Sequence, residues 1–322
     1  MSNIIITSSG RRVSLVNYFK KELKKIYPSG KVIALDSKIN LSAAAQIADL
    51  ALPISNVGND KYISDLLNIC LENDVKIVIP TIDTELEMMA QHRDAFKKQG
   101  VELLVSNSNF IDICNDKTKS HTFFIKNGIA TPKIYSKENY KYPLFIKPKN
   151  GSSSVDNYLI TESANFSKTY FDNNNLLFFE YIDTNLYDEF TCDAYYNNKG
   201  ILKCVVPRKR IEVRGGEVNK GVTKRNELVE IIKDKLSEIP GARGCLAMQF
   251  FVHKKDKSIK GIEINARFGG GFPLSYLAGA NYPKWILEEY LLKNDIDYFD
   301  TWEGDLLMLR YDAEILIHGH KV

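Results

Sequence analysis

The first part of the chain alternates between short apolar runs and longer segments in which apolar residues recur every three or four positions. The first pattern predicts buried strands, and the second predicts amphipathic helices. Strands are predicted over residues 3–7, 31–35, 51–54, 76–79 and 101–105, and helices over residues 13–26, 43–48, 62–72 and 86–98. Apolar strands that alternate with helices are typical of a parallel sheet covered on both faces. The expected fold class of this part is α/β, with a doubly wound sheet.

Beyond about residue 110 the pattern changes, and strands follow one another with few helices between them. A helix is predicted to begin at residues 115–117 and to run to about Asn127. Further strands are predicted over residues 142–147, 176–181, 189–196, 201–207 and 305–317, and further helices over residues 228–239 and 278–292. The basic stretch 208–221 (RKRIEVRGGEVNKG) is interpreted as a loop. This part of the chain is therefore expected to be α+β.

One pair of segments predicts a β-hairpin. The apolar-rich residues 245–253 and 259–265 flank the polar stretch 254–258, which is a hairpin signal. If the hairpin is centred on Asp256, Gln249 lies directly opposite Glu263. The register is therefore specific enough to say which side chains meet.

This hairpin carries candidate metal-binding chemistry. Side chains alternate in direction along a strand, so Glu263, Asn265 and Arg267 share one face. A carboxylate and two amide oxygens, counting Gln249, suit Mg²⁺, and the planar guanidinium suits a phosphate. Polar side chains that merely face water are the alternative, and the turn Gly269–Gly271 directly after Arg267 favours a site.

Polar residues also follow three of the predicted parallel strands, at residues 8–12, at Asp36 and at residues 81–85. Ligands of parallel sheets bind at the carboxyl ends of the strands. The first of these turns has a single glycine, Gly10, where a dinucleotide fingerprint needs three. We therefore expect a small anionic substrate here, rather than a dinucleotide.

The candidate substrate residues lie at these strand ends and in the basic stretch: Arg11, Arg12, Asp83, Glu85, Arg210 and Arg214. Either Arg210 or Arg214 could hold a substrate carboxylate through two parallel hydrogen bonds. For Asp83 and Glu85 a second interpretation stays open, because acids at the start of a helix also complement its dipole.

Composition excludes some classes of function. The 322 residues exceed one average domain, and 44% hydrophobic and 26% charged residues are typical of a soluble globular protein. A net charge of +3 gives no reason to expect nucleic acid or a membrane surface as partner. No segment approaches the ~20 apolar residues of a membrane helix. Five dispersed cysteines without a CxxC pair favour reduced thiols and a cytoplasmic location.

Six segments occur in a characteristic order: NDKTKSHTFFIKNGIATPK, YPLFIKPKNGSSS, LLFFEYI, EFTCDAY, ARGCLAMQF and GIEINARF. Together they resemble the ATP-grasp superfamily, most closely its carbamoyl-phosphate synthetase large subunit and biotin carboxylase branch, with one ATP-grasp unit. The resemblance implies a doubly wound pre-ATP-grasp domain over residues 1–112. It further implies a small lobe over residues 113–183 and a large lobe, with the metal and phosphate site, over residues 184–322.

The nucleotide contacts that the resemblance implies fall on nine residues: Lys117, Lys147, Ser152, Ser153, Ser154, Glu180, Tyr181, Ile182 and Glu189. In this family the two lysines contact the phosphates, and the turn at residues 150–154 closes over them. Residues 180–182 read the adenine, and Glu189 binds the ribose.

The resemblance also implies that Gln249, Glu263 and Asn265 hold Mg²⁺ or Mn²⁺. It places Arg267 on the transferring phosphoryl group, so the expected catalytic residues are Arg267, Lys147 and Lys117. The hairpin geometry and the resemblance therefore point to the same four positions on the two strands.

The expected activity is that of an ATP-dependent ligase, which activates a carboxylate as an acyl phosphate and joins it to an amine. A small-molecule kinase and a non-catalytic ATP-binding module remain alternatives, and a dehydrogenase ranks last. The expected partners are ATP and small-molecule carboxylate and amine substrates, with a homodimer as the assembly. Neither nucleic acid nor a membrane is expected.

Overall fold

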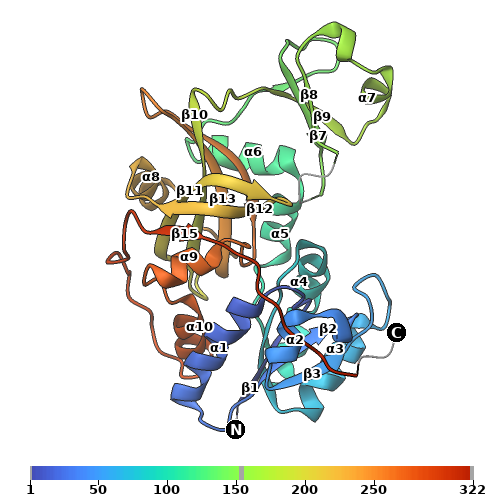
Figure 1. Cartoon of the computed structure of the whole chain (residues 1–322), viewed down its shortest axis with the longest axis vertical. Coiled ribbons are helices and arrows are strands. Elements are labelled where there is room, and N and C mark those ends of the chain that lie inside the picture. Colours follow the sequence, from blue (N-terminus) through green and yellow to red (C-terminus); the bar gives the residue numbers. More distant parts are fainter. Residues whose placement is uncertain (1, 152–155, 320–322) are drawn as a thin grey trace.

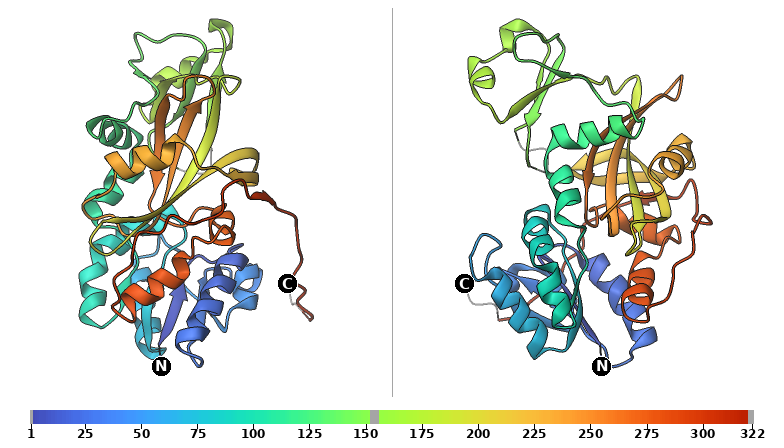
Figure 2. Two further views of the ribbon diagram at one scale, coloured as in Figure 1. Left: turned by 90° about the vertical axis from the view of Figure 1, so that its left-hand side faces the viewer. Right: turned by 180° about the vertical axis from the view of Figure 1, so that it is seen from behind.

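The computed structural model describes residues 2–151 and 156–319. The molecule is elongated, with a parallel sheet and its helices at one end and a small antiparallel sheet at the other (Figure 1). A larger antiparallel sheet lies between them, and the small sheet stands clear of the N-terminal domain in all views (Figure 2). The expected α/β class, with α+β architecture in the C-terminal part, is confirmed.

The N-terminal sheet is fully parallel, in the order β3-β2-β1-β4-β5. Its strands are β1 (Asn3–Ile6), β2 (Val32–Asp36), β3 (Leu50–Pro53), β4 (Val75–Ile79) and β5 (Glu102–Leu103). Its helical segments are α1 (Val13–Ile26), η1 (Ile39–Leu41), α2 (Ala43–Ile47), α3 (Tyr62–Glu72) and α4 (Asp83–Lys98). Strand order reverses between β1 and β4, so their carboxyl ends form the crevice in which such sheets bind ligands.

The large antiparallel sheet has the order β14-β13-β10-β11-β12-β15. Its strands are β10 (Tyr187–Tyr196), β11 (Leu202–Arg214), β12 (Glu217–Thr223), β13 (Gly244–His253), β14 (Ile259–Asn265) and β15 (Leu307–Leu309). Gln249 pairs with Glu263, as a hairpin centred on Asp256 requires. One step toward the turn, Phe250 pairs with Gly261, so Ile262 is the extra residue of a β-bulge.

The interpretation of residues 208–221 as a loop is wrong, because β11 and β12 continue through them as a hairpin. Its turn is Gly215–Gly216, whose φ angles of 57° and 77° are accessible to glycine at no steric cost. The predicted terminal strand is shorter than expected and covers only β15. The predicted helix 278–292 begins late, at Tyr282.

The remaining helical segments follow the large sheet or link it to its neighbours: α5 (Ser108–Asn115), α6 (Lys117–Lys126), α8 (Glu227–Lys235), α9 (Phe272–Leu277) and α10 (Tyr282–Tyr290). Asp116 caps α6 by accepting a hydrogen bond from the backbone N–H of Thr118 at 2.8 Å. Phe124 of α6 packs on Phe250 of the large sheet. A side chain at Gly261 would come within 2.7 Å of the Phe124 ring, so α6 packs tightly on β14. The domain boundaries stay a prediction.

The small sheet has the order β6-β9-β7-β8 and a core of its own. Its elements are β6 (Ile134–Tyr135), β7 (Leu144–Pro148), β8 (Tyr158–Ile160), η2 (Ser163–Asn165), α7 (Lys168–Asp172) and β9 (Leu176–Glu180). The buried residues of this core are Leu144, Ile146, Ile160, Leu176 and Phe178. The other buried apolar residues belong mainly to one continuous core that joins the large sheet to the N-terminal domain.

All five cysteines are free thiols in the structure. Among the helices of residues 2–151 and 156–319, none combines the length and the apolar character that crossing a membrane requires.

Candidate active site

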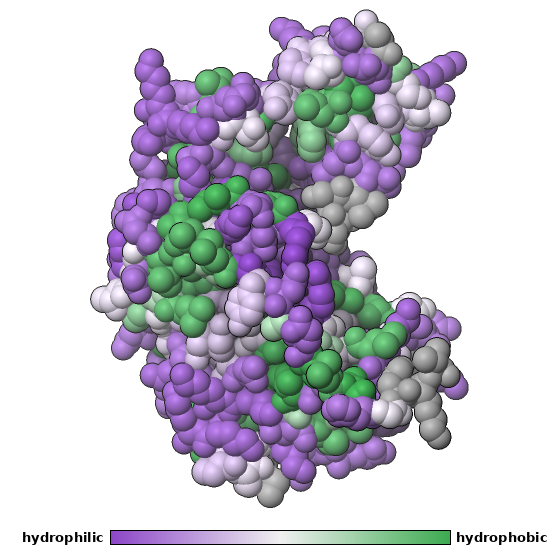
Figure 3. All heavy atoms as spheres, viewed as in Figure 1, coloured by the Kyte–Doolittle hydropathy of each residue, from purple (hydrophilic) through white to green (hydrophobic). Residues whose placement is uncertain are grey.

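A cavity of about 940 Å³ lies where the small sheet, the large sheet and the N-terminal domain meet. The molecule is hollowed between the small lobe and the N-terminal domain, and hydrophilic side chains gather beside this hollow (Figure 3). The lining includes residues at the carboxyl ends of β1 and β4 and on the inner face of the large sheet. A cavity of this size suits a nucleotide together with a small substrate.

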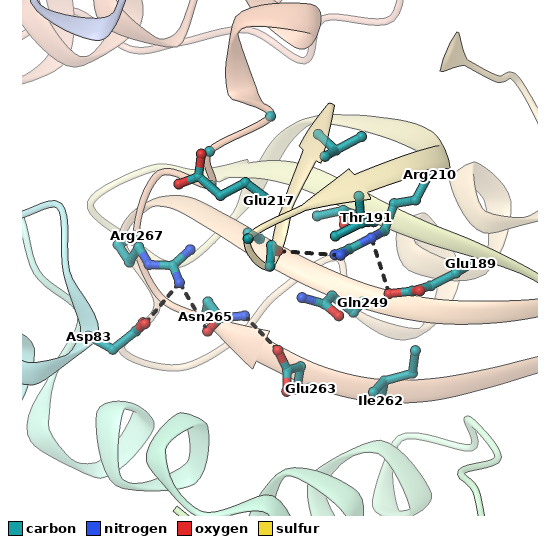
Figure 4. Close-up of a pocket in the computed structure, with 18 of the residues that line it drawn as sticks. Asp83, Glu189, Thr191, Arg210, Glu217, Gln249, Ile262, Glu263, Asn265 and Arg267 are labelled. Carbon is teal, nitrogen blue, oxygen red and sulfur yellow. Dashed lines mark hydrogen bonds and ion pairs between the residues drawn. The ribbon is translucent and has the colours of Figure 1, made fainter. Parts of the chain in front are cut away.

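The hairpin residues gather on the face that the sequence predicted (Figure 4). The Asn265 side-chain N–H donates to Glu263 Oε1 at 3.2 Å, and Arg267 donates to Asn265 Oδ1 at 3.4 Å. Gln249 lies opposite Glu263 on β13 and lines the same cavity. Arg267 also forms an ion pair with Asp83 of α4, at 2.8 Å. The row therefore joins the large sheet to the N-terminal domain.

The donor set of this row fits Mg²⁺. The described residues contain no group of three or more His, Cys, Asp or Glu that could hold a metal. A metal here would therefore need the amide oxygens of Gln249 and Asn265 beside the Glu263 carboxylate, and hard oxygen donors are what Mg²⁺ prefers. A half-turn of the Asn265 amide brings its oxygen to the Glu263 side. The role of these residues as metal ligands stays a prediction.

Two buried lysines line the cavity. Lys117 and Lys147 are each 7% exposed. Lys117 Nζ donates to the backbone oxygen of Gly151 at 2.9 Å, and Lys147 Nζ lies 4.6 Å from the centre of the Phe179 ring. Burial lowers the pKa of Lys147 to about 8, although Glu263 opposes this. Burial also lowers the pKa of Lys117, and Glu263 again opposes. Both cations therefore lie in a low-dielectric site, where an anion is bound strongly.

The hinge residues 180–182 line the cavity beside these lysines. The Glu180 carboxylate is held by Lys260 at 2.8 Å and accepts the backbone N–H of Lys133 at 3.0 Å. These contacts engage the carboxylate, and the Glu180 backbone N–H donates to the Lys133 carbonyl at 2.8 Å. Recognition of an adenine by residues 180–182 stays a prediction. Nearby Phe179 and Ile262 supply apolar surface.

Glu189 and Arg210 face each other on β10 and β11. Arg210 Nε lies 3.3 Å from Glu189 Oε1. Burial raises the pKa of Glu189, and Arg210 opposes this. Figure 4 shows this pair on the opposite side of the site from Asp83 and Arg267. Arg210 therefore lies beside the predicted ribose carboxylate rather than with the other expected substrate residues.

The described cavity lining does not include two of the predicted substrate residues, Glu85 and Arg214. The Glu85 side chain is fully buried and accepts the backbone N–H of Thr81 at 2.8 Å and the Tyr62 hydroxyl at 2.8 Å. These contacts hold Glu85 at the N-terminus of α4, where the alternative that the sequence left open was an acid that complements the helix dipole. Arg214 points into solvent and forms an ion pair with Asp312. The predicted closing-loop residues Ser152, Ser153 and Ser154 lie outside the described residues.

The sequence analysis missed a cluster of arginines around Glu217 of β12. Arg310 Nη1 lies 3.2 Å from the Glu217 carboxylate, Arg11 Nη2 3.7 Å and Arg12 Nη1 3.9 Å. Of these residues, only Arg11 and Arg12 were expected to contact substrate. Glu217 lay in the stretch interpreted as a loop, and Arg310 lay in the predicted terminal strand, to which no role was given. The Gly-Gly dipeptide at residues 215–216 is a hairpin signal that could have revealed the position of Glu217.

Arg208 is a second residue that the sequence did not reveal. It is 1% exposed, and its Nε and Nη2 donate to Asp193 at 2.7 and 2.9 Å. Asp193 in turn accepts the Ser275 hydroxyl at 2.6 Å. Arg208 Nη1 has no hydrogen-bond partner among the residues that the structure describes.

Comparison with solved structures identifies the fold. The biotin carboxylase–beta-gamma-ATP complex from Campylobacter jejuni matches with a TM-score of 0.74 and 13% identity, over 95% of this chain and 74% of that chain. An L-amino acid ligase from Bacillus licheniformis matches with a TM-score of 0.68 and 17% identity, over 90% and 74%. The N5-carboxyaminoimidazole synthetase from Staphylococcus aureus, complexed with ADP, matches with a TM-score of 0.67 and 14% identity, over 88% and 76%.

The class that the fold defines is therefore ATP-grasp, with the fold that the biotin carboxylase structure shares and one ATP-grasp unit. Within this class, residues 4–104 match the family model of the PylC-like N-terminal domain. Residues 172–308 match the model described as ATP-grasp in the biosynthetic pathway with Ter operon. No curated protein matches the sequence significantly. The resemblance to the ATP-grasp superfamily is confirmed.

Proposed function

We propose that this chain is an ATP-dependent ligase that activates a carboxylate as an acyl phosphate and joins it to an amine. The observation that carries the proposal is the row of Gln249, Glu263, Asn265 and Arg267, with Lys117 and Lys147 lining the same cavity. The ligases among the structural neighbours support this class of reaction.

The residues of the chain act by binding and orienting charged groups. Lys117 and Lys147 hold the phosphates of ATP, and burial strengthens their attraction. Arg267 binds the transferring phosphoryl group, and its ion pair with Asp83 fixes the direction of the guanidinium. Gln249, Glu263 and Asn265 would hold Mg²⁺ or Mn²⁺, which when bound neutralises charge on the phosphate oxygens.

The reaction has two steps. A carboxylate oxygen of the first substrate bonds to the γ-phosphorus of ATP, and ADP leaves. The amine nitrogen of the second substrate then bonds to the acyl carbon and loses a proton, and inorganic phosphate leaves. Catalysis of this kind depends on positioning and on charge stabilisation, which the cavity supplies without an activated serine or cysteine.

The test is release of ADP and phosphate with Mg²⁺ and an amino-acid pool, combined with mass spectrometry of the products. We expect release to depend on an added carboxylate and amine, with a product mass equal to their condensation. Glu263→Ala should lower the rate by ~10²–10³-fold. The matched control is Glu212→Ala, since Glu212 is an exposed β11 glutamate that pairs with Lys220 outside the cavity. A product heavier by one phosphoryl group would identify a kinase instead.

Two further expectations belong to this proposal. The free state of all five thiols supports a reducing compartment, the cytoplasm. A homodimer stays a prediction. One structural neighbour, a biotin carboxylase domain from Hydrogenobacter thermophilus, is described as a dimer, and light scattering would test the assembly of this chain.

A further inference from the structure

The arginine cluster around Glu217 forms a subsite at the mouth of the cavity. Its members come from three distant segments: Arg11 and Arg12 from the turn after β1, Glu217 from the start of β12, and Arg310 from just after β15. Arg12 is largely buried, with 19% of its side chain exposed, whereas Arg11 is 79% exposed. The charges of Arg267 and Asp83 are close enough to shift the pKa of Arg12. The cluster therefore adjoins Arg267, the residue proposed to bind the transferring phosphoryl group.

The glycine turn after β14 makes this close approach possible. A Cβ atom on Gly270 would lie 2.4 Å from the carboxyl carbon of Glu217. A Cβ atom on Gly271 would lie 2.1 Å from Arg208 Nη1, the buried nitrogen without a partner among the described residues. Glycine at these two consecutive positions therefore lets the backbone contact the side chains of Glu217 and Arg208 in the cavity wall.

The charges of the cluster do not balance. The ion pairs Arg267–Asp83 and Arg208–Asp193 each match one cation with one carboxylate. Glu217, in contrast, faces three guanidinium groups, which leaves a surplus of two positive charges. Burial would raise the pKa of Glu217, but Arg12, Arg310 and Arg11 outweigh this and hold the pKa below its usual range. Glu217 therefore stays ionised, and surplus charge beside a buried arginine calls for an anionic ligand.

We propose that this subsite binds an acidic amino acid as one of the two substrates of the ligase. Two of the three guanidinium groups match the two carboxylates, the ionised Glu217 matches the ammonium group, and the exposed Arg11 is left to water. Arginine forks bind carboxylates through paired charge-assisted hydrogen bonds. This inference rests on the proposed function for the fate of the ligand, but recognition itself needs no turnover.

Ligand-observed NMR tests the inference in the absence of ATP, with L-aspartate and L-glutamate as probes. We expect saturable binding of at least one of them to the wild-type protein. The matching amide, L-asparagine or L-glutamine, lacks one negative charge, and the matching dicarboxylate, succinate or glutarate, lacks the ammonium group. Each should bind at least tenfold more weakly, because each loses one charged partner.

Variants localise the binding. Glu217→Gln and Arg310→Leu should each weaken binding of the acidic amino acid by tenfold or more. Arg214→Leu is the matched control, because it removes an arginine that lies outside the cavity. ATP binding by each variant, measured by calorimetry, shows that the protein is folded.

Several outcomes would overturn the inference. Equal binding of the amide and the acid would show that the second carboxylate is not recognised. Equal binding of the dicarboxylate would remove the role of Glu217. If neither amino acid binds while ATP is hydrolysed with another carboxylate, this inference fails and the ligase proposal stands. If an acidic amino acid binds in this subsite but no ligation or acyl phosphate is ever detected, the subsite stands and the ligase proposal fails.

Discussion

The two ends of the cavity use positive charge in different ways. At the nucleotide end, Lys117 and Lys147 are buried and form no ion pair among the residues that the structure describes. At the substrate end, Arg12 and Arg310 lie against Glu217, and Arg267 lies against Asp83. The lysines therefore pay a desolvation cost that a bound phosphate can offset, while the arginines are already oriented by protein carboxylates.

This difference separates the pH dependence of nucleotide binding from substrate selectivity. A buried lysine has a pKa within reach of physiological pH, whereas an arginine stays charged. We infer that the pH dependence of nucleotide binding comes from the lysine end. Substrate selectivity comes from the arginine end, where fixed charges set the geometry. The predictions that follow change the nucleotide end, the place where the two ends meet, and a residue outside the cavity.

The largest expected effect is on the nucleotide end. Lys147→Met should lower ATP turnover by ~10²–10³-fold, because a preorganised charge next to the phosphates is lost. The same change should stabilise the free protein, by on the order of 3 kcal/mol at pH 7, since a pKa near 8 reflects an unfavourable buried charge. Turnover assays and urea unfolding measure the two effects. A loss of both activity and stability would contradict this account.

The pH dependence follows from the same group. The folded pKa of Lys147 lies below the unfolded value of about 10.4, so its destabilising effect is full below pH 8 and fades as pH rises toward 10. Bound phosphates raise this pKa again, so ATP binding should take up protons near pH 8. Affinity should then fall roughly tenfold between pH 7 and pH 9.

Calorimetry in buffers of different ionisation enthalpy measures this proton uptake. Lys117, Glu263 and Glu189 are the charged neighbours of Lys147. Lys147→Arg keeps the positive charge and removes the titration, so it should flatten the pH profile. An unchanged profile in that variant would assign the titration to a neighbour.

A smaller effect is expected where the two ends meet. Asp83→Asn removes the carboxylate that orients Arg267 and leaves a similar shape. Both side chains of the pair are partly exposed, so we expect about 1 kcal/mol, or roughly fivefold in kcat/KM. Asp83 is a positioning residue in this account, and ATP affinity measured without turnover should hardly change. A complete loss of activity would mean that Asp83 touches substrate directly.

The smallest effect is expected outside the cavity. Arg214→Leu breaks an exposed pair with Asp312, and such pairs contribute little to stability because solvent screens them. Turnover and melting temperature should both stay close to the wild type. A clear loss of turnover would restore Arg214 to the substrate site, and would weaken the distinction between paired arginines inside and outside the cavity.

The sequence predicted those helices and strands well whose pattern of apolar residues lies within one short segment. Helices α1 and α3 begin and end where their apolar spacing placed them. The pairing of Gln249 with Glu263 followed from the symmetry of one hairpin, although the bulge at Ile262 shifts the pairs nearer the turn by one residue. The prediction of a loop over residues 208–221 was wrong for a physical reason. Arg208 can be buried in a strand because Asp193 on the neighbouring strand neutralises its charge. A charged residue without its distant partner looks like a surface residue.

The candidate site shows the same limit. The predicted metal ligands lie on one hairpin, and their shared face could be derived from alternation along two strands. The cluster around Glu217 brings together residues that are 93 positions apart, Glu217 and Arg310. The charge of each is visible in the sequence, but their meeting depends on the pairing of β15 with β12 across the large sheet.

The small sheet also has a consequence for how the molecule fluctuates. Among the residues that the structure describes, its core has five buried residues and is separate from the main core. A unit of this size opens at a lower free energy than the whole chain unfolds. Amide protons of β7 and β9 should therefore exchange with deuterium long before those of β1 and β13. Bound nucleotide, by joining Lys147 of this sheet to the large one, should slow their exchange more than that of any other strand.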